Sequence, residues 1–132
     1  MRHLIDTQIL IWTIISPEKL TAQTIDLLQN NEIFVSQISF LEIAIKQKIG
    51  KLPELDLSIA ALTTRAEQDG FNLLMLQTRH IDTYGTIPLY PNHRDPFDRI
   101  LLATALSENI PIISADENFD LYAPQIQIIK NA

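Results

Sequence analysis

The sequence predicts an α/β fold in which a parallel β-sheet is covered by helices on both faces. Short apolar segments alternate with helical segments almost throughout the 132 residues. The apolar segments lack the hydrophobic–polar alternation of a sheet with one solvated face, so we expect strands that are buried on both sides. Strands that alternate with helices are typical of parallel sheets. The length suits one hydrophobic core, and we expect a single domain over residues 1–132.

Five short apolar segments are the expected strands. The first, Leu4-Ile5, ends at the acidic residue Asp6. The second is rich in β-branched and aromatic residues, which fit a pleated and buried surface. The five segments are residues 4–5, 33–35, 71–76, 110–113 and 126–129.

Helices are expected between these strands, and several carry recognisable start or stop signals. One helix is expected to start at Ser39 and to continue through Lys48, with Gly50 as its C-terminal stop. Asp95-Pro96 opens the clearest helix, which runs to about Glu108, because Asp is a good N-cap and Pro fits the first helical position. The other helices are expected at residues 7–15, 21–30, 58–69, 78–84 and 117–122, with a loop at 86–94.

The composition excludes several kinds of site. The chain has 16 Asp+Glu and 10 Lys+Arg, a net charge of −6, which argues against gripping nucleic acid through bulk positive charge. It does not exclude binding of nucleic acid through bound cations. Without cysteine there is no disulfide, no thiolate zinc site and no Cys nucleophile. The longest apolar stretch, Ile9 to Ile15, is too short to span a bilayer, and we expect a soluble, cytoplasmic protein.

Four acidic residues follow the expected strands or open the helices after them. Asp6 and Asp116 come directly after strands, whereas Glu42 and Asp98 are expected in the first turn of a helix. Since ligands of open α/β sheets bind beyond the carboxyl ends of the strands, we expect these four side chains to share one edge of the sheet. Each also has a purely structural explanation as a helix cap or, for Glu42, as the acid of a capping box that starts at Ser39. Taken singly, capping is the commoner role.

Taken together, the four acids point to a metal site. Carboxylates that share a crevice repel one another and raise one another's pKa, which a divalent cation relieves. Oxygen ligands completed by water suit Mg²⁺ or Mn²⁺. Such ions are used to hydrolyse phosphodiesters, so the residues indicate a metal-dependent phosphoryl-transfer site. A phosphatase or phosphoreceiver is disfavoured because Thr7 and Gln8 stand where those classes carry a second acid.

Four short blocks occur in the order seen in PIN-domain proteins: Asp6–Trp12, Ser36–Ala44, His93–Arg99 and Ser114–Phe119. The chain most resembles the VapC-type toxins of bacterial toxin–antitoxin pairs, and the resemblance covers essentially its whole length. It implies a three-layer α/β/α sandwich with a parallel sheet of four or five strands. It also implies a Mg²⁺- or Mn²⁺-dependent endoribonuclease that acts on RNA, forms a homodimer and is inhibited by a partner antitoxin.

The resemblance assigns roles to the acids and their neighbours. Asp6, Glu42, Asp98 and Asp116 match the acidic site of the family; we expect the first and third to bind metal directly and the other two to help order metal and water. The hydroxyl positions beside two of the acids match Thr7 and Ser114, which are expected to hydrogen-bond to carboxylates or metal-bound water. Asp95 also matches the family, although its role as a helix cap explains it fully.

Three basic residues near the acids are candidate RNA contacts: His93, Arg94 and Arg99. A guanidinium group matches phosphate oxygens, but a salt bridge with nearby acids explains Arg99 equally well. A general-base role for His93 is disfavoured, because a metal ion would activate water without it. The alternative function is a binding module of the same fold whose acids no longer catalyse and which acts through protein or RNA contacts.

Overall fold

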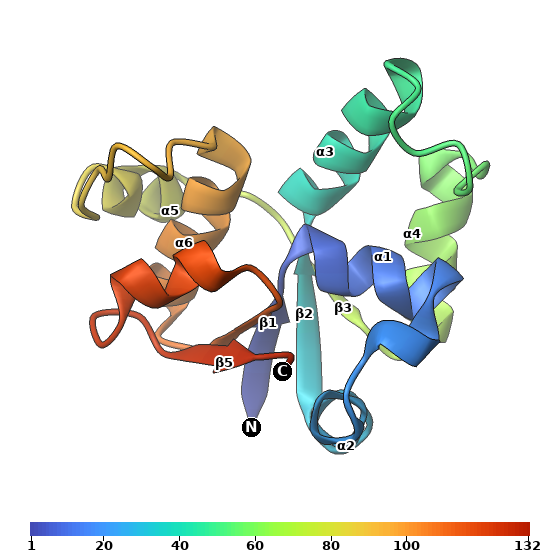
Figure 1. Ribbon diagram of the computed structural model, residues 1–132, viewed down its shortest axis with the longest axis horizontal. Coiled ribbons are helices and arrows are strands. Elements are labelled where there is room, and N and C mark those ends of the chain that lie inside the picture. Colours follow the sequence, from blue (N-terminus) through green and yellow to red (C-terminus); the bar gives the residue numbers. More distant parts are fainter.

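A five-stranded parallel sheet forms the centre of the computed structural model, which describes residues 1–132 (Figure 1). The strand order is β3-β2-β1-β4-β5, and every neighbouring pair is parallel. The strands are β1 Arg2–Ile5, β2 Glu32–Ser36, β3 Asn72–Leu74, β4 Ile112–Ser114 and β5 Ile128–Lys130. The predicted parallel sheet is therefore confirmed, with all five of its strands.

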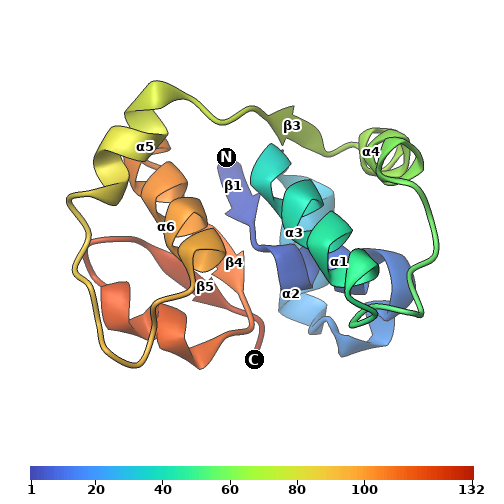
Figure 2. The same ribbon diagram turned by 90° about the horizontal axis from the view of Figure 1, so that it is seen from above.

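Helices cover both faces of this sheet. Successive residues of a strand point to opposite faces. Ile5 accordingly packs in one apolar cluster with α1, α3 and α4, and Leu4 packs in the other with α6 and the segment after β4. Seen from above, these two groups of helices lie on opposite sides of the strands (Figure 2). The helices are α1 Thr7–Ile15, α2 Ala22–Asn30, α3 Gln37–Lys48, α4 Ile59–Gln68, α5 Thr78–Tyr84 and α6 Pro96–Glu108, with 3₁₀ turns η1 Pro17–Lys19 and η2 Glu117–Tyr122. The three-layer α/β/α prediction is confirmed.

Two strand boundaries differ from the prediction for the same reason. Ile110 and Ile126 are buried, with 6% and 2% exposure, but neither lies in a strand. Their backbone N–H groups donate to Ala105 and Tyr122 of the preceding helical turns instead of joining a ladder. Burial made these residues look like strand residues, whereas their backbone still belongs to the helix ends. β4 and β5 therefore begin two residues later than predicted.

The start of α3 also differs from the prediction. Ser36, the last residue of β2, caps this helix by accepting a hydrogen bond from the Ile38 N–H at 3.1 Å. The strand therefore passes into the helix without a loop, and Ser39 lies inside the helix with its side chain fully buried. The proposed capping box between Ser39 and Glu42 was wrong, and Glu42 lies in the second turn rather than the first.

The other helix signals behaved as predicted. Asp95 accepts a hydrogen bond from the Phe97 N–H at 2.8 Å and Pro96 follows at the first helical position, so α6 begins as expected. Ser58 caps α4 in the same way. Gly50 ends α3 with a φ of +76°, a conformation that residues with a Cβ adopt at a cost. No helix has the length and apolar character needed to cross a membrane.

Candidate metal centre

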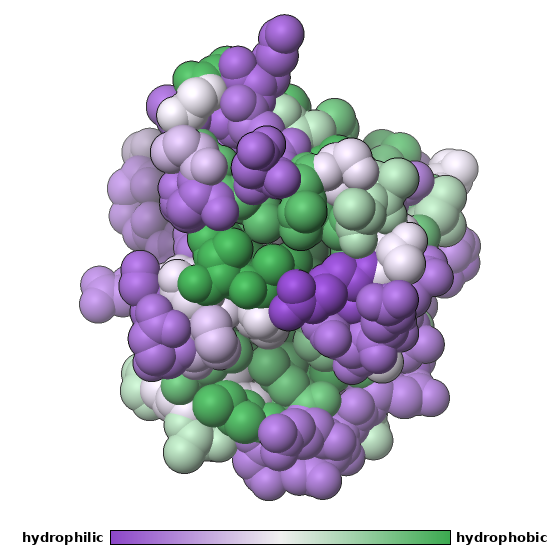
Figure 3. Space-filling model, turned by 90° about the vertical axis from the view of Figure 1, so that its right-hand side faces the viewer, coloured by the Kyte–Doolittle hydropathy of each residue, from purple (hydrophilic) through white to green (hydrophobic).

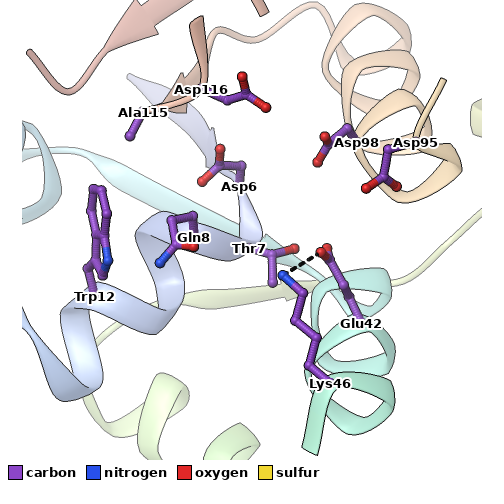
Figure 4. Close-up of a pocket in the computed structure, with 10 residues that line it drawn as sticks. All are labelled: Asp6, Thr7, Gln8, Trp12, Glu42, Lys46, Asp95, Asp98, Ala115 and Asp116. Atoms are coloured by element: carbon purple, nitrogen blue, oxygen red, sulfur yellow. Dashed lines mark ion pairs between the residues drawn. The ribbon is translucent and has the colours of Figure 1, made fainter. Parts of the chain in front are cut away.

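A cavity of about 360 Å³ opens at the carboxyl edge of the sheet, between α1, α3 and α6 (Figure 4). Five of the residues that line it are acidic, and Figure 4 shows that four of them come from separate segments of the chain, with Asp95 beside Asp98. The lining residues are Asp6, Thr7, Gln8, Trp12, Glu42, Lys46, Asp95, Asp98, Ala115 and Asp116. The structure thus brings together the four acids that the sequence singled out.

Asp6 is the most buried of these acids, with 3% of its surface exposed. It follows β1 and caps α1, because one carboxylate oxygen accepts a hydrogen bond from the Ile9 N–H at 2.8 Å. Burial raises the pKa of this carboxyl group to about 7. Hydrogen bonds from Ser114 and Ile9 oppose the increase, and the charges of Asp98 and Asp116 add to it. In the metal-free protein this carboxyl group therefore gives up its proton less readily than an exposed aspartate does.

Asp98 lies in the first turn of α6, across the cavity from Asp6. Burial raises its pKa to about 6, against a hydrogen bond from His93 that lowers it. The charges of Asp95 and Glu42 raise it further. Two carboxyl groups in one cavity thus resist ionisation mainly because they are desolvated, and a cation would reverse that penalty.

Glu42 supplies a second indication of a cation site. It is 7% exposed, and its Oε2 forms an ion pair with Lys46 at 3.1 Å, as the i,i+4 spacing allows (Figure 4). Its other oxygen, Oε1, is buried and has no hydrogen-bond partner. A buried carboxylate oxygen without a donor is costly, and a bound cation is one way to satisfy it.

Asp116 and Ser114 complete the acidic edge at the end of β4. Asp116 caps η2 by accepting a hydrogen bond from the Asn118 N–H at 2.9 Å, and it is partly exposed. The buried Ser114 hydroxyl accepts a hydrogen bond from the Asp116 N–H at 3.0 Å and lies near enough to Asp6 to lower the pKa of that carboxyl group. Ser114 therefore links two of the acids. Thr7, by contrast, donates to the Ser39 hydroxyl at 3.0 Å and ties α1 to α3.

Capping and metal binding are compatible at these positions. Asp6 and Asp116 each use one oxygen, Oδ1, to accept a backbone N–H. A carboxylate has a second oxygen and further lone pairs, and Figure 4 shows these carboxyl groups gathered around the same cavity. The donor set contains only oxygen atoms from the four acids, which fits Mg²⁺ or Mn²⁺.

The predicted RNA contacts are not all at the surface. Arg99 is 3% exposed, and its guanidinium donates to the Pro88 carbonyl at 2.7 Å and to the Tyr84 hydroxyl at 3.2 Å. It neither pairs with an acid nor faces solvent, so both explanations offered for it were wrong. His93 is also buried, at 4% exposure, and does not reach the surface as an RNA contact would. Arg94 is exposed and remains a candidate.

The contacts that hold His93 could not be inferred from the sequence. Its Nδ1 lies 2.8 Å from the Tyr122 hydroxyl and its Nε2 lies 3.1 Å from Asp98 Oδ2. Tyr122 comes from η2, far from His93 along the chain, and no local sequence pattern pairs the two residues. One ligand atom each of His93, Asp98 and Asp116 lie within 4.8 Å of one another.

A parallel sheet between two layers of helices, with four acids at its carboxyl edge, defines an α/β domain that carries an acidic cavity. A sequence model of the PIN domain matches residues 3–123, and the chain belongs to the PIN-domain family. A search of curated protein sequences found no match.

Solved structures with the same fold cover almost the whole chain. A chain of VapBC2 from Rickettsia felis, bound to a promoter DNA fragment, is 13% identical with a TM-score of 0.70, over 98% of each chain. One of DNA-bound VapBC from Salmonella typhimurium is 17% identical with a TM-score of 0.69, over 100% of this chain and 99% of that one. One of VapBC-1 from Haemophilus influenzae is 19% identical with a TM-score of 0.66, over 98% of each. At these identities the likeness concerns the fold.

Proposed function

We propose that this protein is a Mg²⁺- or Mn²⁺-dependent endoribonuclease of the VapC type, the toxin of a toxin–antitoxin pair. The observation that carries the proposal is the cavity in which Asp6, Glu42, Asp98 and Asp116 meet. Family membership supports it, as do similar structures described as VapBC and toxin–antitoxin complexes. We also propose that the protein acts in the cytoplasm, where its RNA substrate would be found.

The acids would act by holding the cation and by keeping the cavity negative until it binds. Asp6 and Asp98 both line the cavity and are the expected direct ligands, with Asp116 and Glu42 ordering the ion and its water (Figure 4). A divalent cation supplies positive charge for phosphate oxygens and lowers the pKa of a nearby water molecule. The caps on Asp6 and Asp116 fix the carboxylates in advance, so little ordering is left for the moment of binding.

Lys46 gives the site a positive group in addition to the cation. Its ammonium group lines the cavity and is paired with Glu42. A phosphodiester that enters the cavity brings negative charge close to Lys46, which stabilises the bound RNA by Coulomb attraction. The exposed Arg94, four residues before Asp98, adds a second positive charge for the RNA backbone.

An apolar groove supports a protein partner. Figure 3 shows apolar side chains gathered on the face that carries α3 and α4. The groove between these helices measures about 350 Å³, and six of its seven lining residues are hydrophobic. On α3 and at its C-cap, Leu41, Ile45 and Ile49 remain 50%, 40% and 58% exposed. We propose that an antitoxin segment covers this groove, and that the chain forms a homodimer. Leu41→Lys should weaken inhibition by the antitoxin and leave RNA cleavage by the free protein unchanged.

The decisive experiment is metal-dependent cleavage of total cellular RNA. Wild-type protein is incubated with Mg²⁺, Mn²⁺ or EDTA and compared with Asp98→Asn and with the control Asp56→Asn, which changes an exposed acid outside the cavity. We expect discrete fragments that require metal, vanish with Asp98→Asn and persist with Asp56→Asn. If folded, metal-loaded wild-type protein leaves host RNA intact, the alternative of a non-catalytic binding module is favoured instead.

A further inference from the structure

A buried chain of polar side chains runs from the interior to the edge of the cavity. The Arg99 guanidinium lies 3.4 Å from the Tyr122 hydroxyl, which lies 2.8 Å from His93 Nδ1. His93 Nε2 in turn lies 3.1 Å from Asp98 Oδ2. All members but Asp98 are at least 96% buried, so water does not compete for these contacts.

The direction of each hydrogen bond in this chain follows from Arg99 and from the burial of Tyr122. A guanidinium has only donors, so the Tyr122 oxygen accepts from Arg99. Tyr122 is 1% exposed, and its phenol proton has no other acceptor than His93 Nδ1, which must be unprotonated to accept it. A neutral imidazole with an unprotonated Nδ1 carries its proton on Nε2, and this N–H points at the Asp98 carboxylate. Burial raises the pKa of the Tyr122 phenol, which keeps its donor proton in place.

The packing around His93 holds the ring in this orientation. Its backbone N–H donates to the Tyr90 carbonyl at 3.1 Å. Its ring lies against Phe119 and Tyr122, with centroid distances of 5.8 and 5.5 Å. A ring enclosed on these sides cannot turn its Nε2 toward Asp116 without leaving Tyr122 and Asp98 without their partners.

We propose that His93 is a positioning residue: Arg99 and Tyr122 fix it as the Nε2–H tautomer, and it holds Asp98 Oδ2 so that the other oxygen of Asp98 faces the cation. His93 then binds no metal itself, although one of its ring nitrogens lies within 4.8 Å of a carboxylate oxygen of Asp98 and of Asp116. A ligating nitrogen needs a free lone pair, and in this tautomer Nε2 has none. The inference rests on the proposed function, since it concerns the same cavity.

Two measurements on metal-free protein test this assignment without RNA. Nitrogen-15 NMR of labelled histidine distinguishes the two tautomers of His93. Calorimetric titration with Mn²⁺ then compares wild type with His93→Leu and with His93→Gln, whose amide can donate to Asp98 and accept from Tyr122. Tyr122→Phe removes the hydroxyl group that donates to His93 Nδ1. Tyr90→Phe is its matched control, because the Tyr90 hydroxyl donates to the Leu121 carbonyl and not to His93.

We expect the Nε2–H tautomer in wild type and a mixture of tautomers with Tyr122→Phe. Mn²⁺ affinity should fall about 10- to 100-fold with His93→Leu and recover most of that loss with His93→Gln, as is usual when a partner of a metal ligand is removed. A Nδ1–H tautomer in wild type, or equal Mn²⁺ affinity of His93→Leu and wild type, would overturn the proposal. So would equal defects in the Leu and Gln variants. If wild type binds no Mn²⁺, the proposed function fails. The tautomer of His93 still tests whether Arg99 and Tyr122 orient its ring as proposed.

Discussion

Replacement of Asp6 by Asn should stabilise the metal-free protein while abolishing the proposed RNA cleavage. The Asn side chain keeps a carbonyl oxygen for the Ile9 N–H and remains a good N-cap, so α1 retains its start. What the change removes is a carboxylate that the fold buries to 3% exposure beside two other acids. A desolvated charge without a cation opposes folding.

The size of the effect follows from the pKa of Asp6. An increase from 3.8 to about 7 corresponds to about 4 kcal/mol, at about 1.4 kcal/mol per pH unit. The native state binds the proton more tightly than the unfolded chain, so wild-type stability is highest below pH 3.8 as far as Asp6 is concerned. It falls as pH rises from there through about 7. The Asn amide has its own desolvation cost, so we expect a gain of about 2–4 kcal/mol near pH 8.

Urea denaturation in EDTA at several pH values measures this difference. The advantage of Asp6→Asn over wild type should be near zero around pH 4, grow steadily, and level off above about pH 7. Asp56→Asn, at an exposed acid, should show no such growth. Added Mg²⁺ should then stabilise wild type, by about 2.7 kcal/mol at one hundred times its dissociation constant, and have much less effect on the variant.

Two results would refute the reasoning about Asp6. An Asp6→Asn protein that is less stable than wild type at pH 8 in EDTA would mean that the carboxylate stabilises the fold. A difference that stays constant between pH 4 and pH 8 would mean that Asp6 does not change its ionisation in that range.

Three further predictions concern other charged or titratable side chains. Lys46→Gln should raise Mn²⁺ affinity roughly three- to fivefold, because the cation no longer competes with an ammonium group for Glu42, whereas Lys48→Gln on the same helix should not; calorimetric titration measures both. Arg99→Lys should lower the free energy of unfolding by roughly 2–3 kcal/mol in urea, since one ammonium group cannot satisfy the Pro88 carbonyl and two tyrosine hydroxyls. Burial lowers the pKa of His3, so wild type should lose stability as pH falls below 6.5; His3→Leu should lose less, and equal losses would contradict the assignment.

Elements with local signals could be predicted from the sequence. The caps at Ser58 and Asp95 and the stop at Gly50 depend on a few neighbouring residues, and the structure has each of them. The start of α3 was missed because two serines could cap it. Only the length of β2 decides between them, and strand length depends on pairing with β1 and β3.

The site divides in the same way. Asp6, Asp98 and Asp116 could be predicted because each lies close to a strand end or a helix start, and the topology of a parallel sheet brings such positions together. Glu42 lies one turn further into α3, on the side of that helix that faces the cavity. The burial of Arg99 and His93 could not be predicted from the sequence. Their partners come from α5, the loop after it and η2, and no pattern within one segment shows that Tyr84, Pro88 and Tyr122 converge on α6.

Helix capping by Asp6 and Asp116 helps the fold to tolerate several acids in one place. A helix N-terminus offers unpaired N–H groups and a partial positive charge, which favour a carboxylate there even without metal. Each of these caps occupies one oxygen, so the fold is built before a cation is present. Glu42 has no such cap; its Lys46 pair leaves one buried oxygen without a donor. The remaining unfavourable groups are thus the buried Glu42 Oε1 and the desolvated charge of Asp6. Those are the two places where a bound divalent cation would contribute most to stability, and where substitution should separate stability from function.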